Sequence, residues 1–280
     1  MASEWTTALR AHWPEYLIEG WALGTFMVSA GIVATLLGAP ASPLYHALPD
    51  PLWRNAAGGL AMGVTAVALI HSHWGKRSGA HMNPAVTLTF LRLGRIRPWD
   101  AFFFVLAQLL GGLAGVLLVA VLVGHAFSDP PVSYAATLPG PRGPVVAFVA
   151  EFAISAVLML TVLSLSASRR LAPFTGVTVG GLVASYITFE SPLSGMSMNP
   201  ARSLASAAPG MLWHHLWIYL SAPLLGMLSG AQLFLMIAGA PRVLCAKLLH
   251  PLGIACIHCG YEPSPARARA SSAHRASAST

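Results

Sequence analysis

The sequence predicts an all-α membrane protein with six transmembrane helices and two re-entrant half-helices, arranged as an inverted-topology repeat. Three observations support this fold class: a scarcity of charge, six charge-free runs, and a motif that occurs twice. Of the 280 residues, 55% are hydrophobic and only 9% are Asp, Glu, Lys or Arg. A soluble domain carries about a quarter charged residues, which keep its surface in water. The composition therefore excludes a soluble enzyme, a disordered chain and a collagen-like fibre.

Runs without Asp, Glu, Lys or Arg mark the expected spans, because a spanning helix needs about 20 mostly apolar residues. The runs lie between Glu19 and Asp50, Arg54 and Lys76, Asp100 and Asp129, Glu151 and Arg169, Arg170 and Glu190, and Arg202 and Arg242. We therefore expect helices at about 17–38, 56–74, 99–123, 146–167, 172–190 and 214–238.

The distribution of Lys and Arg predicts the orientation, because cytoplasmic segments of membrane proteins are enriched in basic residues. With both termini in the cytoplasm, only three of the 16 basic residues fall outside, namely Arg54, Arg142 and Arg202. The other thirteen fall inside: Arg10, Lys76, Arg77, Arg92, Arg95, Arg97, Arg169, Arg170, Arg242, Lys247, Arg267, Arg269 and Arg275. This asymmetry also explains the net charge of +7. Nucleic-acid binding is not expected, because no clustered basic face or fold motif accompanies the charge.

One segment occurs twice, at an offset of 116 residues. Ser78-Gly-Ala-His-Met-Asn-Pro-Ala-Val-Thr-Leu88 and Ser194-Gly-Met-Ser-Met-Asn-Pro-Ala-Arg-Ser-Leu204 agree at seven of eleven positions. Each copy follows the second of three spans, and halves with an odd number of spans insert in opposite orientations. The repeats are expected at about 16–124 and 145–240. Each Asn-Pro segment is too short to cross, so it should fold back inside the protein or along a watery cavity.

The Asn-Pro-Ala triplets at 83–85 and 199–201 are expected to start the two half-helices. Asn is a good N-cap, and Pro is favoured at the first helical position. Inverted symmetry would point both N-termini at the membrane centre, where their partial positive charges add. Amide N–H groups left over from capping would favour a neutral hydrogen-bond acceptor there and repel a cation. A simple turn would explain one Asn-Pro pair but not two in register.

This paired motif resembles the signature of the major intrinsic protein family, the aquaporins and glycerol facilitators. The resemblance covers about residues 15–240 and includes Glu151-Phe152 at the start of the fourth span. It implies an aquaporin-like channel domain at 16–240, between a cytoplasmic N-terminal segment at 1–15 and a cytoplasmic tail at 241–280. It also implies a right-handed bundle, a homotetramer in which each subunit holds its own pore, passive transport and no cofactor.

The resemblance further implies roles for individual residues. The central constriction would comprise Asn83, Pro84, Ala85, Asn199, Pro200 and Ala201. Backbone carbonyls forming an acceptor ladder would come from Gly79, Ala80, His81, Gly195, Met196 and Ser197. Arg202 would lie in the outer selectivity filter. An unpaired buried Arg is costly in a membrane, so we expect carbonyl groups to support its side chain.

The rest of the expected filter departs from the family pattern. Met62 stands where Phe or Trp is usual, and Met196 lies three residues before the second Asn. The fifth-helix position, which is His in strict water pores, falls on Ile187 or Tyr186, depending on a one-residue gap. This ring is more apolar and adaptable than the usual Phe–His pair. Ser203 stands where glycerol facilitators characteristically carry Asp, which favours water conduction.

Two glutamates are expected to support the re-entrant loops by accepting backbone N–H bonds. Glu151 stands in the position that the family uses. In the first half that position is Trp21, and Glu19 lies two residues earlier. Glu19 therefore either supports the first loop or is an interfacial residue, since charges near helix ends can reach the membrane surface.

All three cysteines follow the last span, and together with His250 they form the pattern C-x4-H-x5-C-x2-C. Cys245, His250, Cys256 and Cys259 would supply four soft ligands to zinc. Their cytoplasmic location disfavours disulfides. A single C-x-x-C pair leaves the alternative open, in which these are reduced thiols near the interface and no metal binds.

The sequence thus predicts a passive channel for water that excludes protons and ions, with small neutral solutes such as ammonia or hydrogen peroxide left open. A glycerol facilitator is the first alternative. An ion-coupled secondary transporter is the second, because inverted repeats also build such proteins. Against it, the acidic groups near the spans are limited to Glu19, Glu151 and Glu190. An enzyme is not expected, because no acid, base and nucleophile converge. With no signal peptide or organelle leader recognised, the expected location is a bacterial inner membrane.

Overall fold

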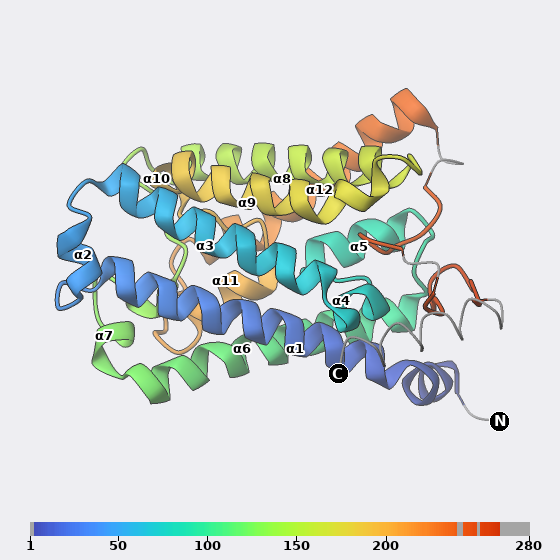
Figure 1. Ribbon diagram of the computed structural model, residues 1–280, viewed down its shortest axis with the longest axis horizontal. Helices are drawn as coiled ribbons and strands as arrows, with labels where there is room; N and C mark the ends of the chain where they lie inside the picture. The colour runs from blue at the N-terminus through green and yellow to red at the C-terminus, as the bar shows by residue number, and fades with distance from the viewer. Residues whose placement is uncertain (1–2, 240–242, 251–252, 264–280) are drawn as a thin grey trace, which may run out of the picture.

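The computed structural model describes residues 3–239, 243–250 and 253–263, and within these ranges its regular structure is entirely helical (Figure 1). Much of the expected tail, including Arg242, Arg267, Arg269 and Arg275, lies outside the described residues. Five described helices are long and apolar enough to cross a membrane. They are α1 (Glu4–Gly38), α6 (Pro98–Val123), α8 (Pro144–Ser166), α9 (Thr175–Phe189, extended by the 3-10 turn η2 at Ala172–Phe174) and α12 (Leu216–Ala238).

The sixth expected span is α3 (Pro51–His71), which is 21 residues long but not among those five. At 1.5 Å per residue it is about 31 Å long, enough to cross the hydrocarbon core. Arg54 and Asn55 near its start lower its mean hydropathy, and one of its faces carries Gly58, Gly59 and Gly63. This face is turned towards α9 and the interior of the bundle, where Gly59 and Gly63 approach the α9 backbone.

The first helix begins at Glu4, so the predicted start at residue 17 was wrong. The added turns are held against α6 by the buried carboxylate of Asp100. Its Oδ1 atom accepts a hydrogen bond from the Tyr16 hydroxyl at 2.6 Å and lies 2.7 Å from His12 Nδ1. A contact between residues so distant in sequence leaves no local pattern, which is why the helix start could not be predicted.

The helices form two related halves around two half-helices, α5 (Pro84–Arg92) and α11 (Pro200–Ala207). The first half contains α1, α3, α5 and α6, and the second contains α8, α9, α11 and α12. Helix α1 packs against α6, α12 packs against α8, and α3 packs against α9 across the halves. Each half-helix also packs against the last helix of the opposite half, α5 on α12 and α11 on α6.

Short elements close the two ends of the bundle. We call one the α4 end, after α4 (His73–Ser78), which lies on the same side as the N-terminus (Figure 1). The other is the α2 end, after α2 (Pro43–Ala47). The remaining short helices are α7 (His125–Ser128), η1 (Ser133–Ala135) and α10 (Ser191–Ser194).

Glycines bring the paired helices into backbone contact. A Cβ added to Gly111 would lie 2.0 Å from the Gly20 carbonyl oxygen, and one added to Gly115 would lie 2.4 Å from that of Gly24. This is the small-xxx-small packing of membrane helices, in which dispersion contacts replace a hydrophobic driving force. The same four-residue spacing recurs where α12 meets α8 and where α3 meets α9, through Gly226, Gly230, Gly59 and Gly63.

We predict that Gly111→Ala lowers the unfolding temperature in detergent, measured by fluorescence-detected size-exclusion chromatography after heating. Overpacking against backbone costs about 1–3 kcal/mol. The matched control is Gly181→Ala on α9, where an added Cβ meets nothing within 4 Å. The control should be neutral or slightly stabilising, because Ala exceeds Gly in helix propensity by about 1 kcal/mol. Equal unfolding temperatures for the two variants would contradict the close packing of α1 on α6.

Candidate functional site

The two Asn-Pro-Ala triplets start the half-helices by the same capping geometry. Asn83 and Asn199 have extended backbones, and a proline follows each at the first helical position. The Asn83 Oδ1 atom accepts the Ala85 N–H at 2.8 Å. Asn199 Oδ1 accepts the N–H groups of Ala201 at 3.0 Å and Arg202 at 3.2 Å. The side-chain oxygens thus satisfy backbone donors that a helix start leaves unpaired.

The amide nitrogens of the same two side chains connect the halves. Asn83 Nδ2 donates to the Met198 carbonyl at 2.7 Å, and Asn199 Nδ2 donates to the Met82 carbonyl at 2.6 Å. This reciprocal pair brings the N-termini of α5 and α11 together inside the bundle. An amide has two N–H groups, so each Asn keeps one after making its bond to the opposite half.

The loops before the two triplets have the same unusual backbone. Ala80 and Met82 in the first loop have φ of 54° and 50°, and Met196 and Met198 in the second have 51° and 54°. Each such residue costs roughly 1–2 kcal/mol, because its Cβ crowds a neighbouring carbonyl oxygen. Strained backbone of this kind persists only where its surroundings hold it in place.

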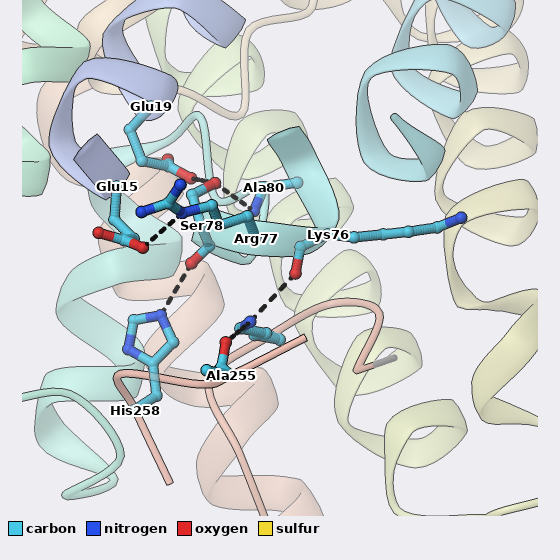
Figure 2. A network of polar contacts seen from close by, with 9 residues as sticks. Glu15, Glu19, Lys76, Arg77, Ser78, Ala80, Ala255 and His258 are labelled. Carbon is cyan, nitrogen blue, oxygen red and sulfur yellow. Dashed lines mark hydrogen bonds and ion pairs between the residues drawn. The ribbon is translucent and has the colours of Figure 1, made fainter. Parts of the chain in front are cut away.

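Glu19 binds the first loop with both carboxylate oxygens, and Figure 2 shows one of these contacts, to Ser78. Oε1 accepts the Ser78 hydroxyl at 2.7 Å and the His81 N–H at 3.0 Å. Oε2 accepts the Met82 N–H at 2.6 Å and the Gln108 amide at 2.9 Å. The residue is 0% exposed, so of the two alternatives for Glu19 the structure places it with the loop and away from the interface.

Glu151 binds the second loop in the same way. Its Oε1 accepts the Ser194 hydroxyl at 2.8 Å and the Ser197 N–H at 2.7 Å. Its Oε2 accepts the Met198 N–H at 2.8 Å. The sequence analysis did not predict that a serine bonds each glutamate. The signal was present, because Ser78 and Ser194 are the matched first positions of the repeated segment. Gln108 gave no such indication.

A cavity of approximately 550 Å³ lies between the two halves. Tyr45 and Arg54 line it near the α2 end, both Asn residues line it at the middle, and His81 lines it near the α4 end. Its remaining walls are mainly apolar side chains of α1, α3, α8 and α9. The cavity is thus mostly apolar, with a few polar groups among its lining residues.

The residues expected to form the filter all line this cavity: Met62, Ile187, Met196 and Arg202. Of the two alternatives at the fifth-helix position, Ile187 lines the cavity and Tyr186 does not. Met62 is held by the Ser29 hydroxyl, which lies 3.7 Å from its sulfur.

One expectation about this site was wrong. Gly79 does not line the cavity, unlike the five other residues of the expected ladder. Its carbonyl instead accepts the Leu248 N–H at 3.2 Å. For Arg202, the Nη1 atom is buried with no hydrogen-bond partner among the described residues, and support of the side chain by carbonyl groups stays a prediction.

Ser203 belongs to a chain of hydroxyl groups behind the second half-helix. Its Oγ lies 2.6 Å from Thr137 Oγ1 and 2.6 Å from Ser197 Oγ. The Ser197 hydroxyl in turn donates to the Asn199 carbonyl at 3.0 Å. A serine at this position therefore connects the outer loop at Thr137 to the start of α11.

Outside the cavity, the four candidate metal ligands also come together. The Sγ atoms of Cys245, Cys256 and Cys259 and a ring nitrogen of His250 all lie within 4.8 Å of one another. All three cysteines are free thiols.

Taken together, these features define a class: integral membrane proteins in which an inverted repeat of three long helices and one half-helix surrounds a central cavity. Comparison with known proteins places the chain within that class. Residues 11–234 match the family model for the Major intrinsic protein. The chain belongs to the major intrinsic protein family.

Individual relatives and a solved structure agree with this assignment. The chain is 35% identical over 180 residues to Aquaporin NIP1-4 of Oryza sativa subsp. japonica, covering 64% of this chain and 63% of that one. It is 35% identical over 220 residues to Aquaporin NIP3-1 of the same plant, covering 76% and 65%. Both matches span less than two thirds of the relative's length. The X-ray structure of the aquaglyceroporin from Plasmodium falciparum has the same fold, with a TM-score of 0.66 at 21% identity, covering 83% of this chain and 99% of that one.

We predict that Glu19→Gln destabilises the protein by about 1.5–3 kcal/mol, the usual contribution of a hydrogen bond to a charged group. The Gln amide would place N–H donors against the donors of the first loop. Thermal unfolding of the purified protein measures the effect. Glu4→Gln at the exposed start of α1 is the control and should unfold as the wild type does. A Glu19→Gln protein as stable as this control would show that the carboxylate does not hold the loop.

Proposed function

We propose that the protein is a passive membrane channel for water and small neutral solutes that excludes protons and ions. The observation that carries the proposal is the cavity in which Asn83 and Asn199 meet. Each side chain has one amide N–H engaged with the opposite half and one left to donate. Two donors at the same level can hold a neutral acceptor such as water while it passes.

Electrostatics at the same place support the exclusion of cations. The N-termini of α5 and α11 meet at the Asn pair, and each contributes a partial positive charge. Arg202 adds a full positive charge to the cavity wall, and its Nη1 atom has no protein partner among the described residues. A cation would have to lose its hydration shell beside these positive groups, whereas a neutral solute would not. Donors are thus presented to oxygen atoms of uncharged molecules.

The lining near Arg202 bears on which solutes pass. Met62, Ile187 and Met196 offer mostly apolar, flexible surface, and Met in particular adapts its shape. Such a ring favours water together with small neutral solutes. Ser203 is committed to the hydroxyl chain with Thr137 and Ser197. Glycerol, ammonia or hydrogen peroxide conduction is the alternative that the test below distinguishes.

An ion-coupled transporter or an enzyme fits the structure less well. Coupling needs ionisable side chains that meet the transported ion. Among the described residues, Glu19, Glu151 and Glu190 do not line the cavity. The first two are also occupied by loop hydrogen bonds.

The protein is an integral membrane protein, and its surface fits a bilayer. Large apolar side chains are exposed on the outer faces of the helices, among them Leu110, Val121, Leu122, Met236 and Ile237. We propose that the α4 end faces the cytoplasm, as the basic residues indicate, and that the subunits form homotetramers. The relatives named above are plant proteins, and they give no support to a bacterial inner membrane.

Stopped-flow light scattering on proteoliposomes tests the channel. We expect osmotic shrinkage after a sucrose challenge to be faster than in empty vesicles, with a low activation energy. Replacing sucrose by glycerol, and then by an ammonium gradient, measures solute entry in the same vesicles. Water flux at the empty-vesicle level alongside rapid solute entry would overturn the water reading.

We predict that Arg202→Ala raises the permeability to glycerol relative to water by about tenfold, which corresponds to about 1.4 kcal/mol. The reason is that removing the guanidinium widens the cavity that Arg202 lines. The control is Arg142→Ala, which replaces an exposed arginine on a connecting segment. Unchanged selectivity in Arg202→Ala would remove the residue from the filter.

A further inference from the structure

The chain beyond α12 returns to cover the α4 end of the bundle. We call the described residues 243–250 and 253–263 the C-terminal segment. It contains no helix or strand, yet Val243, Ala246, Lys247, Leu248 and Cys256 are buried. Apolar residues from the segment also belong to the core formed by the transmembrane helices. A segment without regular structure has therefore become part of the core.

Its polar contacts are with the first re-entrant loop. The Leu248 N–H donates to the Gly79 carbonyl at 3.2 Å. His258 Nε2 lies 2.8 Å from the Ser78 carbonyl, towards which its ring points (Figure 2). Because a carbonyl oxygen can only accept a hydrogen bond, the His258 Nε2–H is the donor. The segment is thus bonded to backbone only a few residues from Asn83.

The segment also reaches the cavity. Leu248 is one of the cavity-lining residues. The Ala246 carbonyl lies 2.6 Å from His81 Nε2, and His81 Nδ1 lies 3.0 Å from the Thr87 hydroxyl. Both nitrogens of the His81 ring are therefore engaged, so the segment occupies a polar side chain that lines the cavity at this end.

A buried lysine adds to the attachment. Lys247 is 2% exposed, and its ammonium donates to the carbonyls of Lys76 at 3.1 Å and Ala255 at 3.3 Å. Burying a cation is costly unless it is hydrogen-bonded. Lys247 therefore joins the two parts of the segment to α4.

The segment also contains four side chains that are suited to bind zinc, namely Cys245, His250, Cys256 and Cys259. The Cys245 and Cys256 sulfurs are 3.4 Å apart, and His250 Nε2 is 3.2 Å from the Cys259 sulfur. A tetrahedral zinc with Zn–S of about 2.3 Å and Zn–N of about 2.0 Å requires ligand atoms about 3.5–3.8 Å apart. These two separations are slightly shorter than that range, and all four ligand atoms lie within 4.8 Å of one another. A disulfide, at about 2.05 Å, would use two of the four groups and leave the other two unexplained.

The ligands also bracket the contacts with the channel. Cys245 immediately precedes the stretch 246–248, which meets Gly79 and His81, and Cys256 and Cys259 flank His258. One metal ion would hold both contact stretches relative to each other. Without helix or strand, the segment's own backbone bonds are few, such as Gly260 N–H to the Cys256 carbonyl at 3.0 Å. Metal binding commonly supplies the folding free energy of segments of this kind.

We propose that Cys245, His250, Cys256 and Cys259 bind one Zn²⁺, and that the zinc-bound C-terminal segment narrows the α4 mouth of the cavity. The metal site stands on the ligand geometry alone. The narrowing rests on the proposed channel function.

Metal analysis of the purified full-length protein tests the site. Protein from zinc-supplemented cells should contain one zinc per chain by inductively coupled plasma mass spectrometry. Cys259→Ser and His250→Ala should each lose the metal. His214→Ala, which alters an exposed histidine outside the cluster, should keep it. A wild-type protein without zinc would overturn the site, as would an intact mass that reveals a Cys245–Cys256 disulfide.

Water permeability of proteoliposomes tests the narrowing. Removing zinc from the wild type with a membrane-permeant chelator should raise permeability to that of Cys259→Ser, on which the chelator should have no effect. Leu248→Ala should keep its zinc and still raise permeability, because it shortens the side chain that lines the cavity. Full zinc loss without a change in permeability would overturn the narrowing.

The two proposals fail in distinguishable ways. If neither the wild type nor any variant exceeds empty vesicles, the channel function is wrong and the narrowing falls with it. The zinc content still decides the metal site in that case, since it is measured without transport.

Discussion

The structure depends on one constraint: the lipid interior offers no water to bond unpaired backbone groups, so every N–H buried there needs a partner within the protein. The two re-entrant loops lack the backbone hydrogen bonds of a regular helix, so their N–H groups need other partners. Glu19 and Glu151 are such partners, because each accepts two backbone N–H groups and a serine hydroxyl from its loop. The buried carboxylates are tolerated because each accepts at least three hydrogen bonds.

The Asn83 and Asn199 side chains also serve two purposes each. Each side chain caps its own half-helix through its oxygen and bonds the opposite half through its nitrogen. The atoms that present a donor to the cavity are therefore fixed by bonds that also hold the halves together. Proposed selectivity and fold stability share these contacts, so a substitution at either Asn cannot alter one without the other.

The features that lie within the repeated segment could be predicted from the sequence. Contacts between residues far apart in the sequence could not. The two half-helices were predicted because the capping chemistry and its repeat lie within eleven contiguous residues. Glu151 could be aligned by pattern, but Glu19 could not, since 59 residues separate it from its serine and only 43 separate Glu151 from Ser194. The connections between spans differ in length, so no fixed spacing exists. Leu248 gave no indication at all, because nothing in an apolar residue shows which distant loop will bond its backbone.

The two re-entrant loops are covered by other segments through similar contacts. The two covering segments differ in how they are connected to the transmembrane helices, and this difference bears on the proposed metal site. The Ser194 carbonyl accepts the Tyr219 hydroxyl at 2.5 Å, as the Ser78 carbonyl accepts His258. A connecting segment lies against Gly195, with the Gly140 N–H bonded to Leu193, as the C-terminal segment lies against Gly79. The connection near Gly195 is anchored at both ends, by α6 and α8, so the fold itself closes that loop. Among the described residues, the C-terminal segment follows one transmembrane helix, α12, and none follows it, so more of the entropy cost of its ordering falls on its own contacts. The proposed zinc ligands lie on both sides of these contacts, so a bound metal ion would take the part that the second helix takes in the other connection.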